Sequence, residues 1–256
     1  MREIEKRLEA AQELALGAGS LLKGCFGGKI EFEKKADGSL VSPADKAAEK
    51  LIIGGLKKRF PSDSILSEES GRADCGGEFL WIIDPLDGTH NYIKGLDIFG
   101  TSIALCRAGA PALGVICMPM TNELFYAHKG GGAFLNGEKI SVSDRDIKDA
   151  TMFFDSSIAR VPERNLAALE RLHNKVFNIR MLGSTVAGLC HIAAGRAELE
   201  VEFCDVVWDF AAGLLIVEEA GGAATELDGG VWGPDTVGYV VSNGRFHDEI
   251  LDLIKP

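Results

Sequence analysis

The chain lacks an excess of basic residues. Its 256 residues carry a formal net charge of −11 at pH 7. A protein that binds nucleic acid needs a basic face that contacts the phosphates, so this composition argues against RNA or DNA as a partner. A small phosphate ester remains compatible with the charge, provided that a divalent cation reverses the sign of the field locally.

The chain also lacks an apolar run of the roughly 20 residues that cross a bilayer. Its first residues, MREIEKRLEAAQELA, are charged and amphipathic, unlike a signal peptide. The six cysteines include no C-x-x-C pair, which argues against a zinc site or a disulfide framework and favours buried, reduced thiols. With 46% hydrophobic residues, the composition predicts a globular cytoplasmic protein with no membrane partner.

The pattern of apolar residues changes along the chain. Helical periodicity extends over residues 3–26, and Ser42 followed by Pro43 marks the start of a second helix. From 79 to 142, apolar segments separated by Gly, Pro and Asn turns predict strands in hairpins. After about residue 146, strand and helix patterns alternate. We therefore expect an α+β fold whose N-terminal part, residues 1–145, carries most site residues, and whose C-terminal part, residues 146–256, completes one compact catalytic unit.

Two acidic residues end the most apolar strand pattern. The run Phe79–Ile83 leads into Asp84, and Asp87 follows within Asp-Gly-Thr. Gly88 allows the backbone to come close to a ligand. Two carboxylates held together repel each other unless a cation lies between them or one is protonated. Because hard oxygen ligands suit Mg²⁺ or Mn²⁺ better than zinc, this segment predicts a metal site.

Three further acidic segments each have a structural alternative. Asp45 lies three residues after Ser42, so it either caps the predicted helix or belongs to the site. Glu68 either lies in a solvated loop or, because apolar residues lead directly into it, points toward the interior of the protein. Asp209 opens an apolar helix, where a carboxylate either satisfies backbone N–H groups or completes the site.

Two long segments resemble signatures of the inositol monophosphatase family. WIIDPLDGTHNYIKG, residues 81–95, is similar to D-P-[IL]-D-G-T-x-N-[FY], and WDFAAGLLIVEEAGG, residues 208–222, is similar to W-D-x-A-[AG]-x-x-[IL]-[ILV]-x-E-A-G-G. LVSPADKAAEKLI, ILSEES and GGGAFLNGEKISVS occur in the expected order, so the resemblance covers nearly the whole chain. A haloacid-dehalogenase-like phosphatase would carry D-x-D-G-T, but Pro85 stands where the first Asp is required.

The resemblance implies a layered αβαβα sandwich of the sugar-phosphatase type and usually a homodimer. It also implies a lithium-sensitive hydrolase that uses two or three Mg²⁺ ions, with Mn²⁺ as a possible substitute. Asp84 would bridge two of these ions. The implied metal ligands are Glu68, Asp84, the carbonyl of Leu86, Asp87 and Asp209.

The resemblance further implies that Asp45, Thr89 and Glu68 act in catalysis, the first two by orienting and deprotonating the attacking water. The residues implied to contact the phosphate or the substrate are Asp87, Gly88, Thr89, Gly183, Ser184, Thr185, Glu202 and Asp209. Glu202 could instead face solvent on an alternating strand, and Asp205 could take its role. Lys34 aligns with a basic residue near the site, with Lys35 adjacent.

The expected function is that of an inositol-1-monophosphatase acting on a small phosphorylated sugar or polyol. Hydrolysis would proceed by two-metal in-line attack of an activated water without a phospho-enzyme. Alternatives in the same fold are a fructose-1,6-bisphosphatase (alone or as a dual activity), a histidinol-phosphate phosphatase and a 3′(2′),5′-bisphosphate nucleotidase. A non-catalytic binding or regulatory subunit is the alternative from another class.

Overall fold

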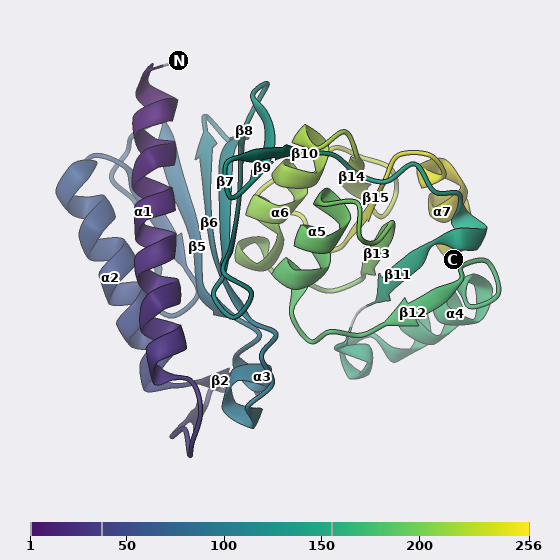
Figure 1. Ribbon diagram of the computed structural model, residues 1–256, viewed down its shortest axis with the longest axis horizontal. Coiled ribbons are helices and arrows are strands. Elements are labelled where there is room, and N and C mark those ends of the chain that lie inside the picture. The colour runs from purple at the N-terminus through teal and green to yellow at the C-terminus, as the bar shows by residue number, and fades with distance from the viewer. Residues whose placement is uncertain (1, 37, 155, 256) are drawn as a thin grey trace.

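Two long helices cover the outer face of the first sheet in the computed structural model, which describes residues 2–36, 38–154 and 156–255. Helix α1 (Arg2–Cys25) and helix α2 (Pro43–Arg59) lie side by side on this sheet (Figure 1). The buried face of α1 consists largely of alanine and leucine. These side chains let α1 approach both α2 and the sheet closely, so the two helices and the sheet share one apolar core.

Helix α2 begins where the sequence predicts. Ser42 is its N-cap and accepts a hydrogen bond from the backbone N–H of Ala44, while Pro43 occupies the first turn. The carboxylate of Asp45 accepts a hydrogen bond from the backbone N–H of Ser42 at 2.8 Å, which closes an acidic capping box. Gly55 lies where a Cβ atom would come within 2.3 Å of Leu14, so glycine permits the close contact between α1 and α2.

The first sheet has eight strands in the order β10-β9-β8-β7-β6-β5-β3-β4. Its strands are β3 (Ser64–Ser67), β4 (Gly71–Ala73), β5 (Phe79–Asp87), β6 (Gly100–Arg107), β7 (Ala110–Met118), β8 (Glu123–His128), β9 (Gly132–Leu135) and β10 (Glu138–Ile140). Strands β5 to β10 follow one another in antiparallel order, and the short helix α3 (Thr89–Lys94) lies between β5 and β6. Strand β3 pairs with β5 in parallel. A small separate pair, β1 (Glu33–Lys34) and β2 (Leu40–Val41), precedes α2.

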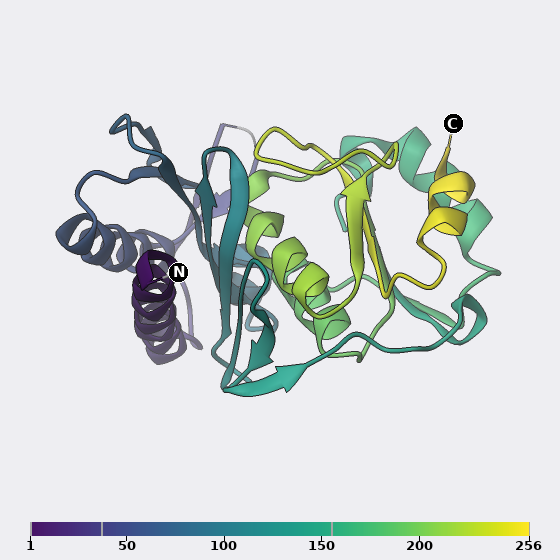
Figure 2. The ribbon, with the colours of Figure 1, turned by 90° about the horizontal axis from the view of Figure 1, so that it is seen from above.

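The second sheet has five strands in the order β12-β11-β13-β15-β14. Its strands are β11 (Thr151–Phe154), β12 (Asn178–Arg180), β13 (Leu199–Glu202), β14 (Ala223–Glu226) and β15 (Tyr239–Ser242). The helices of this part are α4 (Pro162–Leu172), α5 (Thr185–Ala193), α6 (Val207–Glu219) and α7 (His247–Ile254), with 3₁₀ turns at Ile147–Asp149 and Ile158–Arg160. Helices α4 and α7 cover its outer face, as the view from above shows (Figure 2).

Helices α5 and α6 lie between the two sheets, which completes the expected αβαβα sandwich (Figures 1 and 2). Helix α6 is buried along most of its length and packs against strands of both sheets. Gly114 of β7 would place a Cβ atom 2.5 Å from the carbonyl oxygen of Ala212, so glycine allows α6 to lie directly on the first sheet. Within the described residues, none of the helices is long and apolar enough to span a membrane.

Some features differ from the sequence-based expectation. Strand β4 forms from a segment rich in glycine and charge that predicts only a loop, because it pairs with β3 as an edge strand. All six cysteines are free, as expected, but Cys25 and Cys75 are exposed and not buried. Strand β13 shows the alternation of a half-exposed strand, yet every one of its residues is buried because helices cover both faces of the second sheet.

Candidate active site

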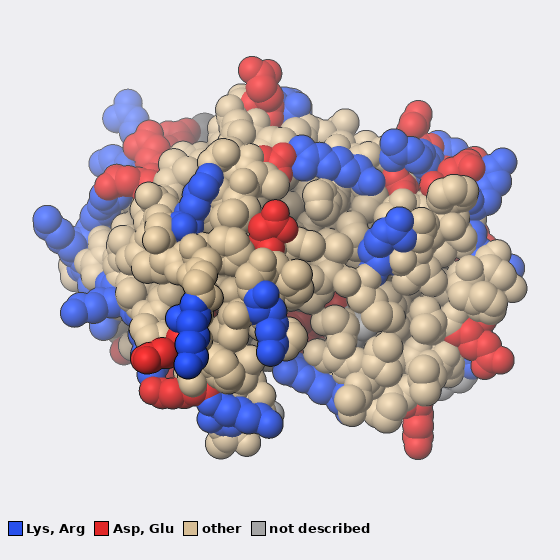
Figure 3. Space-filling model, turned by 60° about the horizontal axis from the view of Figure 1, so that its bottom comes forward, with Lys and Arg blue, Asp and Glu red and all other residues tan. Residues whose placement is uncertain are grey.

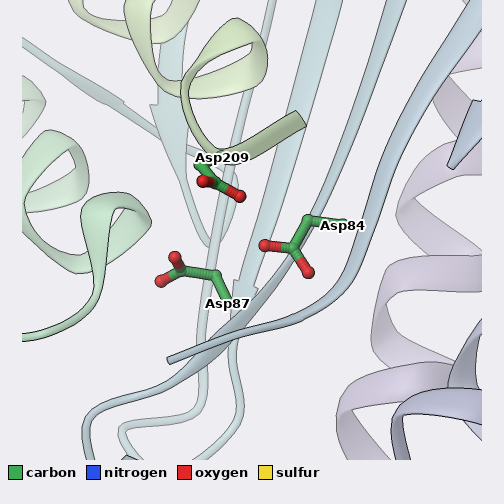
Figure 4. Close-up of side chains that lie close together, drawn as sticks. All are labelled: Asp84, Asp87 and Asp209. Atoms are coloured by element: carbon green, nitrogen blue, oxygen red, sulfur yellow. The ribbon is translucent and has the colours of Figure 1, made fainter. Parts of the chain in front are cut away.

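Three carboxylates meet where β5 ends against the start of α6. Asp84 and Asp87 come from β5, and Asp209 lies in the first turn of α6. Each residue offers one oxygen atom, and these atoms all lie within 4.8 Å of one another. In Figure 4 the three side chains lie close together in the gap between the strand and the helix. The structure therefore brings together residues that lie more than 120 positions apart in sequence.

The end of β5 is shaped to present both of its acids. Its pairing with β6 shifts register between Asp84 and Asp87, around Pro85, which cannot donate a backbone hydrogen bond. Thr101 on β6 donates its hydroxyl to the carbonyl oxygen of Pro85 at 2.9 Å and holds the irregular segment. The backbone N–H of Leu86 donates to Asp84 at 2.9 Å, which fixes the orientation of that carboxylate.

The pKa values of the three acids are raised in the metal-free protein. Burial has the largest effect on Asp84, followed by the negative charges of Glu68 and Asp87. Burial also raises the pKa of Asp87, to about 7, despite hydrogen bonds from Ser184 and from backbone amides. For Asp209, burial and the adjacent carboxylate of Asp205 both raise the pKa. Such a cluster is unfavourable when ionised unless a cation binds, because like charges lie close together in a poorly solvated space.

Asp45 makes contacts that fit both of its alternative roles. Besides closing the capping box of α2, it accepts a hydrogen bond from the hydroxyl of Thr89 at 2.9 Å. Thr89 also lies 2.9 Å from the carbonyl oxygen of Leu86. Burial raises the pKa of Asp45, while hydrogen bonds from Ser42 and Thr89 oppose that shift. Asp45 can therefore cap α2 and contact Thr89 beside the acidic cluster at the same time.

Glu68 points toward the site but pairs with a lysine. Lys35 Nζ lies 2.8 Å from Glu68 and 2.6 Å from Glu69. The residue near the site is therefore Lys35 and not Lys34, which lies exposed in the short strand β1. Lys34 is the last residue of β1 and is exposed, whereas Lys35 follows the strand and turns toward the glutamates. Glu68 still contributes to the raised pKa of Asp84, so its charge acts on the cluster.

A buried glutamate that the sequence analysis missed holds the Glu68–Glu69 segment. One carboxylate oxygen of Glu49, on α2, accepts hydrogen bonds from the hydroxyl of Ser67 at 2.5 Å and from the backbone N–H of Ser70 at 3.0 Å. The N–H of Glu69 and the hydroxyl of Ser70 also donate to it. Only 8% of Glu49 is exposed. No local pattern identifies this role, because it depends on how α2 packs beside β3.

Gly88 and the segment 183–185 lie next to Asp87. Gly88 adopts a φ of 81°, and a Cβ atom there would lie 2.8 Å from the carbonyl oxygen of Ile98, so glycine is required. Ser184 caps α5 and donates its hydroxyl to Asp87, and the N–H of Thr185 donates to the same carboxylate at 3.3 Å. The start of α5 is thus tied to the acidic cluster.

A cavity of about 150 Å³ adjoins the acidic cluster. Glu202 and Asp205 both line it, so the structure does not choose between the two as the expected substrate contact. The alternative of a solvent-facing Glu202 is wrong, because only 9% of this residue is exposed. The described lining residues are Asp87, Phe153, Phe154, Ser156, Ser157, Arg160, Leu182, Gly183, Ser184, Thr185, Gly188, Glu200, Glu202, Cys204, Asp205 and Asp209.

Figure 3 shows the molecule from the side on which β5 ends. Acidic atoms are visible deep in a hollow between the two halves, while lysine and arginine side chains lie at the surface around part of it (Figure 3). A protein of net charge −11 thus presents positive groups near the opening. The basic side chains at the opening favour the approach of an anion. The acidic residues deeper in the hollow themselves require a cation.

Comparison with known proteins identifies the family. The sequence model described as the inositol monophosphatase family matches residues 3–255. The chain belongs to this family. This membership identifies the chain as a phosphatase, and the solved structures of relatives confirm the expected fold.

Individual relatives span nearly the whole chain. The fructose-1,6-bisphosphatase/inositol-1-monophosphatase of Aquifex aeolicus is 36% identical over 260 residues, which cover 100% of this chain and 97% of the relative. The protein of the same description from Thermotoga maritima is 35% identical over 250 residues, covering 97% and 96%. The crystal structure of extragenic suppressor protein suhB from Bartonella henselae superposes with a TM-score of 0.92 at 32% identity and covers 98% of each chain.

The donor set of the cluster fits the metal dependence of an inositol monophosphatase. Two buried carboxylates and one partly buried one, all with raised pKa values, offer hard oxygen ligands, which Mg²⁺ and Mn²⁺ prefer. Among the residues described, those of the cluster itself include neither Cys nor His, the ligands that would favour zinc. The residues therefore suit a divalent cation bound through oxygen atoms.

Proposed function

We propose that this inositol monophosphatase family member is a Mg²⁺-dependent phosphate monoester hydrolase that acts on a small phosphorylated sugar or polyol, with inositol 1-phosphate as the first candidate. The observation that carries the proposal is the meeting of Asp84, Asp87 and Asp209 beside a small polar cavity. A polar cavity next to buried acids suits a hydroxylated substrate whose phosphate lies at the metal end.

In this proposal Asp84, Asp87 and Asp209 hold the metal ions, together with Glu68 and the carbonyl of Leu86. When bound, the cations supply positive charge to the phosphoryl group and a hydroxide equivalent near neutral pH. Asp84 occupies the centre of the acidic set, since the charges of both Glu68 and Asp87 act on it. This position would allow Asp84 to contribute to more than one metal site.

The chain's own groups then orient the water and the phosphate. The hydroxyl of Thr89 donates to Asp45 at 2.9 Å, so a water that donates to Thr89 can pass its proton along this hydrogen bond. The backbone N–H groups of Gly88 and Thr89 bind phosphate oxygens as charge develops on them. Because Pro85 replaces the nucleophilic Asp of the other phosphatase class, we expect in-line attack by water and no phospho-enzyme.

The test is release of inorganic phosphate from a panel of substrates with and without Mg²⁺. The panel contains inositol 1-phosphate, fructose 1,6-bisphosphate, histidinol phosphate and 3′-phosphoadenosine 5′-phosphate. We expect turnover that requires Mg²⁺ and that Asp84→Asn lowers by at least about 10³-fold, since charge stabilisation of the transition state is lost. Asp144→Asn, at an exposed aspartate outside the site, is the matched control.

Two outcomes would overturn the proposal. One is a folded protein that binds Mg²⁺ but hydrolyses none of the four substrates, which would promote a binding or regulatory role. The other is an Asp84→Asn variant as active as the Asp144→Asn control. The substrate with the highest kcat/KM then distinguishes an inositol monophosphatase from a fructose-1,6-bisphosphatase, a histidinol-phosphate phosphatase or a bisphosphate nucleotidase.

The resemblance supports further properties of the same proposal. We infer that lithium inhibits the enzyme, that the protein forms a homodimer in solution and that it is cytoplasmic. We also infer a functional division near residue 146, between the N-terminal part with most metal ligands and the C-terminal part that completes the site. Titration of activity with LiCl tests the first, and light scattering of the purified protein tests the second. Mg²⁺ is the expected cofactor, in two to three sites, and Mn²⁺ is expected to substitute for it.

A further inference from the structure

The cavity beside the acidic cluster is lined by residues of several elements. Asp87 and Asp209 of the cluster line it, and so do Glu200 of β13 and Gly188 of α5. Its volume of about 150 Å³ is that of a cavity that holds one benzene-sized ring. A substrate with its phosphate at the metal end therefore places the body of a single ring near β13.

Glu200 faces this cavity because of the alternation of β13. Its strand neighbours Leu199 and Val201 belong to the apolar core shared with α4 and α7 on the outer face of the sheet. Since successive side chains of a strand point to opposite faces, Glu200 points inward, toward α5. It is only 2% exposed, which makes it a carboxylate held almost entirely away from bulk water.

Two neighbours on different elements fix the position of this carboxylate. The hydroxyl of Tyr239, on β15, donates to Glu200 Oε1 at 2.9 Å. Burial raises the pKa of Tyr239 well above its usual value, so the phenol keeps the proton that it donates. On the other side, a Cβ atom at Gly188 would lie 1.8 Å from Glu200 Oε2. Glycine at this helical position leaves the room that the carboxylate occupies.

The charge of the lining defines what the cavity accepts. Glu200, Glu202 and Asp205 all face it, and among its described lining residues Arg160 alone is basic. Carboxylates accept hydrogen bonds and can accept several at once. A ring that carries hydroxyl or ammonium groups supplies the donors, whereas a second phosphate directed into this end would meet like charge in a poorly solvated space.

We propose that Glu200, held by Tyr239 and accommodated by Gly188, determines substrate specificity by accepting a hydrogen bond from a donor group on the ring of the substrate. This inference rests on the proposed phosphatase function of the same site. It adds that the preferred substrate is a monophosphate whose far side carries hydrogen-bond donors, and that Glu200 disfavours substrates with an anionic group there.

The experiment compares substrates that differ only in their donors. kcat and KM are measured with Mg²⁺ for inositol 1-phosphate, for cyclohexyl phosphate, which lacks ring hydroxyls, and for an aminocyclohexanol phosphate with one ammonium group. The wild type is compared with Glu200→Gln, which keeps the size of the side chain, and with Tyr239→Phe, which removes only the hydroxyl that orients Glu200. Melting temperature with Mg²⁺ is recorded for each protein.

We expect Glu200→Gln to lower the kcat/KM ratio of inositol 1-phosphate to cyclohexyl phosphate by about tenfold, mainly through KM, since a hydrogen bond to a charged acceptor is replaced by one to a neutral acceptor. Tyr239→Phe should lower the same ratio by a smaller factor. If Glu200→Gln lowers kcat/KM for the ammonium substrate more than for inositol 1-phosphate, the donor group of the natural substrate is cationic. If it lowers kcat/KM for the ammonium substrate less, that donor is a hydroxyl. If Glu200→Gln fails to fold, Tyr239→Phe provides the test.

An unchanged ratio in a folded variant would overturn the inference, as would equal losses on all substrates, which indicate a structural role for Glu200. Either result leaves the phosphatase proposal intact, because the wild type still hydrolyses the panel. A wild type inactive toward every phosphate would instead overturn the proposed function, and the inference with it.

Discussion

A single buried carboxylate near the start of β5 and a cluster of carboxylates at its end differ in how their charge is neutralised. Near the start of the strand, Asp63 is only 4% exposed and accepts hydrogen bonds from Arg7 Nε at 2.9 Å and from the indole N–H of Trp81 at 3.0 Å. Arg7 is itself packed over the ring of Phe79. At the other end, Asp84, Asp87 and Asp209 face one another, and burial raises the pKa of each.

The difference teaches how to distinguish a structural acid from a functional one. The chain supplies a counter-charge to Asp63 from its own α1, so this acid is complete within the folded protein. The described salt bridges give Asp84, Asp87 and Asp209 no basic partner, and Lys35 pairs with Glu68 and Glu69. An acid that the fold buries with its counter-charge supports stability, whereas acids buried against one another indicate a ligand that brings the charge from outside.

The largest expected effect on stability comes from breaking the completed pair. Asp63→Asn leaves the guanidinium of Arg7 buried beside two aromatic rings without its anion. We expect the free energy of unfolding to fall by about 3–5 kcal/mol, the usual cost of removing one partner of a buried pair. Urea denaturation measures this change.

In the folded Asp63→Asn protein kcat with Mg²⁺ should stay unchanged, since Asp63 lies at the opposite end of the strand from the acidic cluster. Glu13→Gln, which breaks the exposed pair of Glu13 with Arg59, is the control and should have little effect. A destabilisation no larger than that of the control would contradict the distinction drawn here.

The second prediction concerns pH and the unpaired cluster. The carboxyl of Asp87 titrates at about 7 in the folded protein but near 3.9 in an unfolded chain. Between these values the folded state binds more protons than the unfolded state, so this contribution to stability is present at low pH and is lost as pH rises toward 7. The melting temperature of the metal-free protein should therefore fall between pH 5 and pH 8.

Saturating Mg²⁺ should raise the melting temperature more at pH 8 than at pH 5, because protons compete with the ion for the same oxygen atoms. Differential scanning fluorimetry with EDTA or with Mg²⁺ measures both effects. Asp209→Asn should make the profile of the metal-free protein flatter. A metal-free protein that becomes more stable toward pH 8 would show that the cluster is not the dominant titrating group.

The smallest expected effect comes from the glutamate that holds the Glu68–Glu69 segment. Glu49→Gln retains one acceptor oxygen but removes the charge that gathers four donors from Ser67, Glu69 and Ser70. We expect activity at low Mg²⁺ to fall about tenfold, a typical cost of disturbing groups that orient metal ligands. High Mg²⁺ should restore much of the rate. If the loss is independent of Mg²⁺, Glu49 acts on folding and not on Glu68.

Local sequence signals predict the elements that carry the site. The N-cap at Ser42, the proline at 43 and the apolar run before Asp84 all appear in the structure where the pattern places them. The site acids also stand out, because strand ends and helix starts direct side chains to one place. The order of the layers is not contained in these signals and was expected only from the resemblance to a family.

The residues that sequence analysis missed depend on packing between elements distant in the chain. Glu200 lies on β13, whose alternation of acidic and apolar residues is typical of a strand with one face in solvent. Helices α5 and α6 cover that face, so Glu200 is buried and lines the cavity. Similarly, Lys35, the residue after the two-residue strand β1, reaches Glu68 and Lys34 does not, and no local propensity determines which of the two does.

The position of Asp209 also has a consequence for the order in which the protein is made. A chain emerging from the ribosome completes β5, with Asp84 and Asp87, more than 100 residues before it reaches α6. The N-terminal sheet can therefore fold first, but it then carries an unfinished cation site and lacks the helix that covers its inner face. A fragment truncated before residue 207 should neither bind metal tightly nor hydrolyse phosphate esters, so activity requires that α6 has been made.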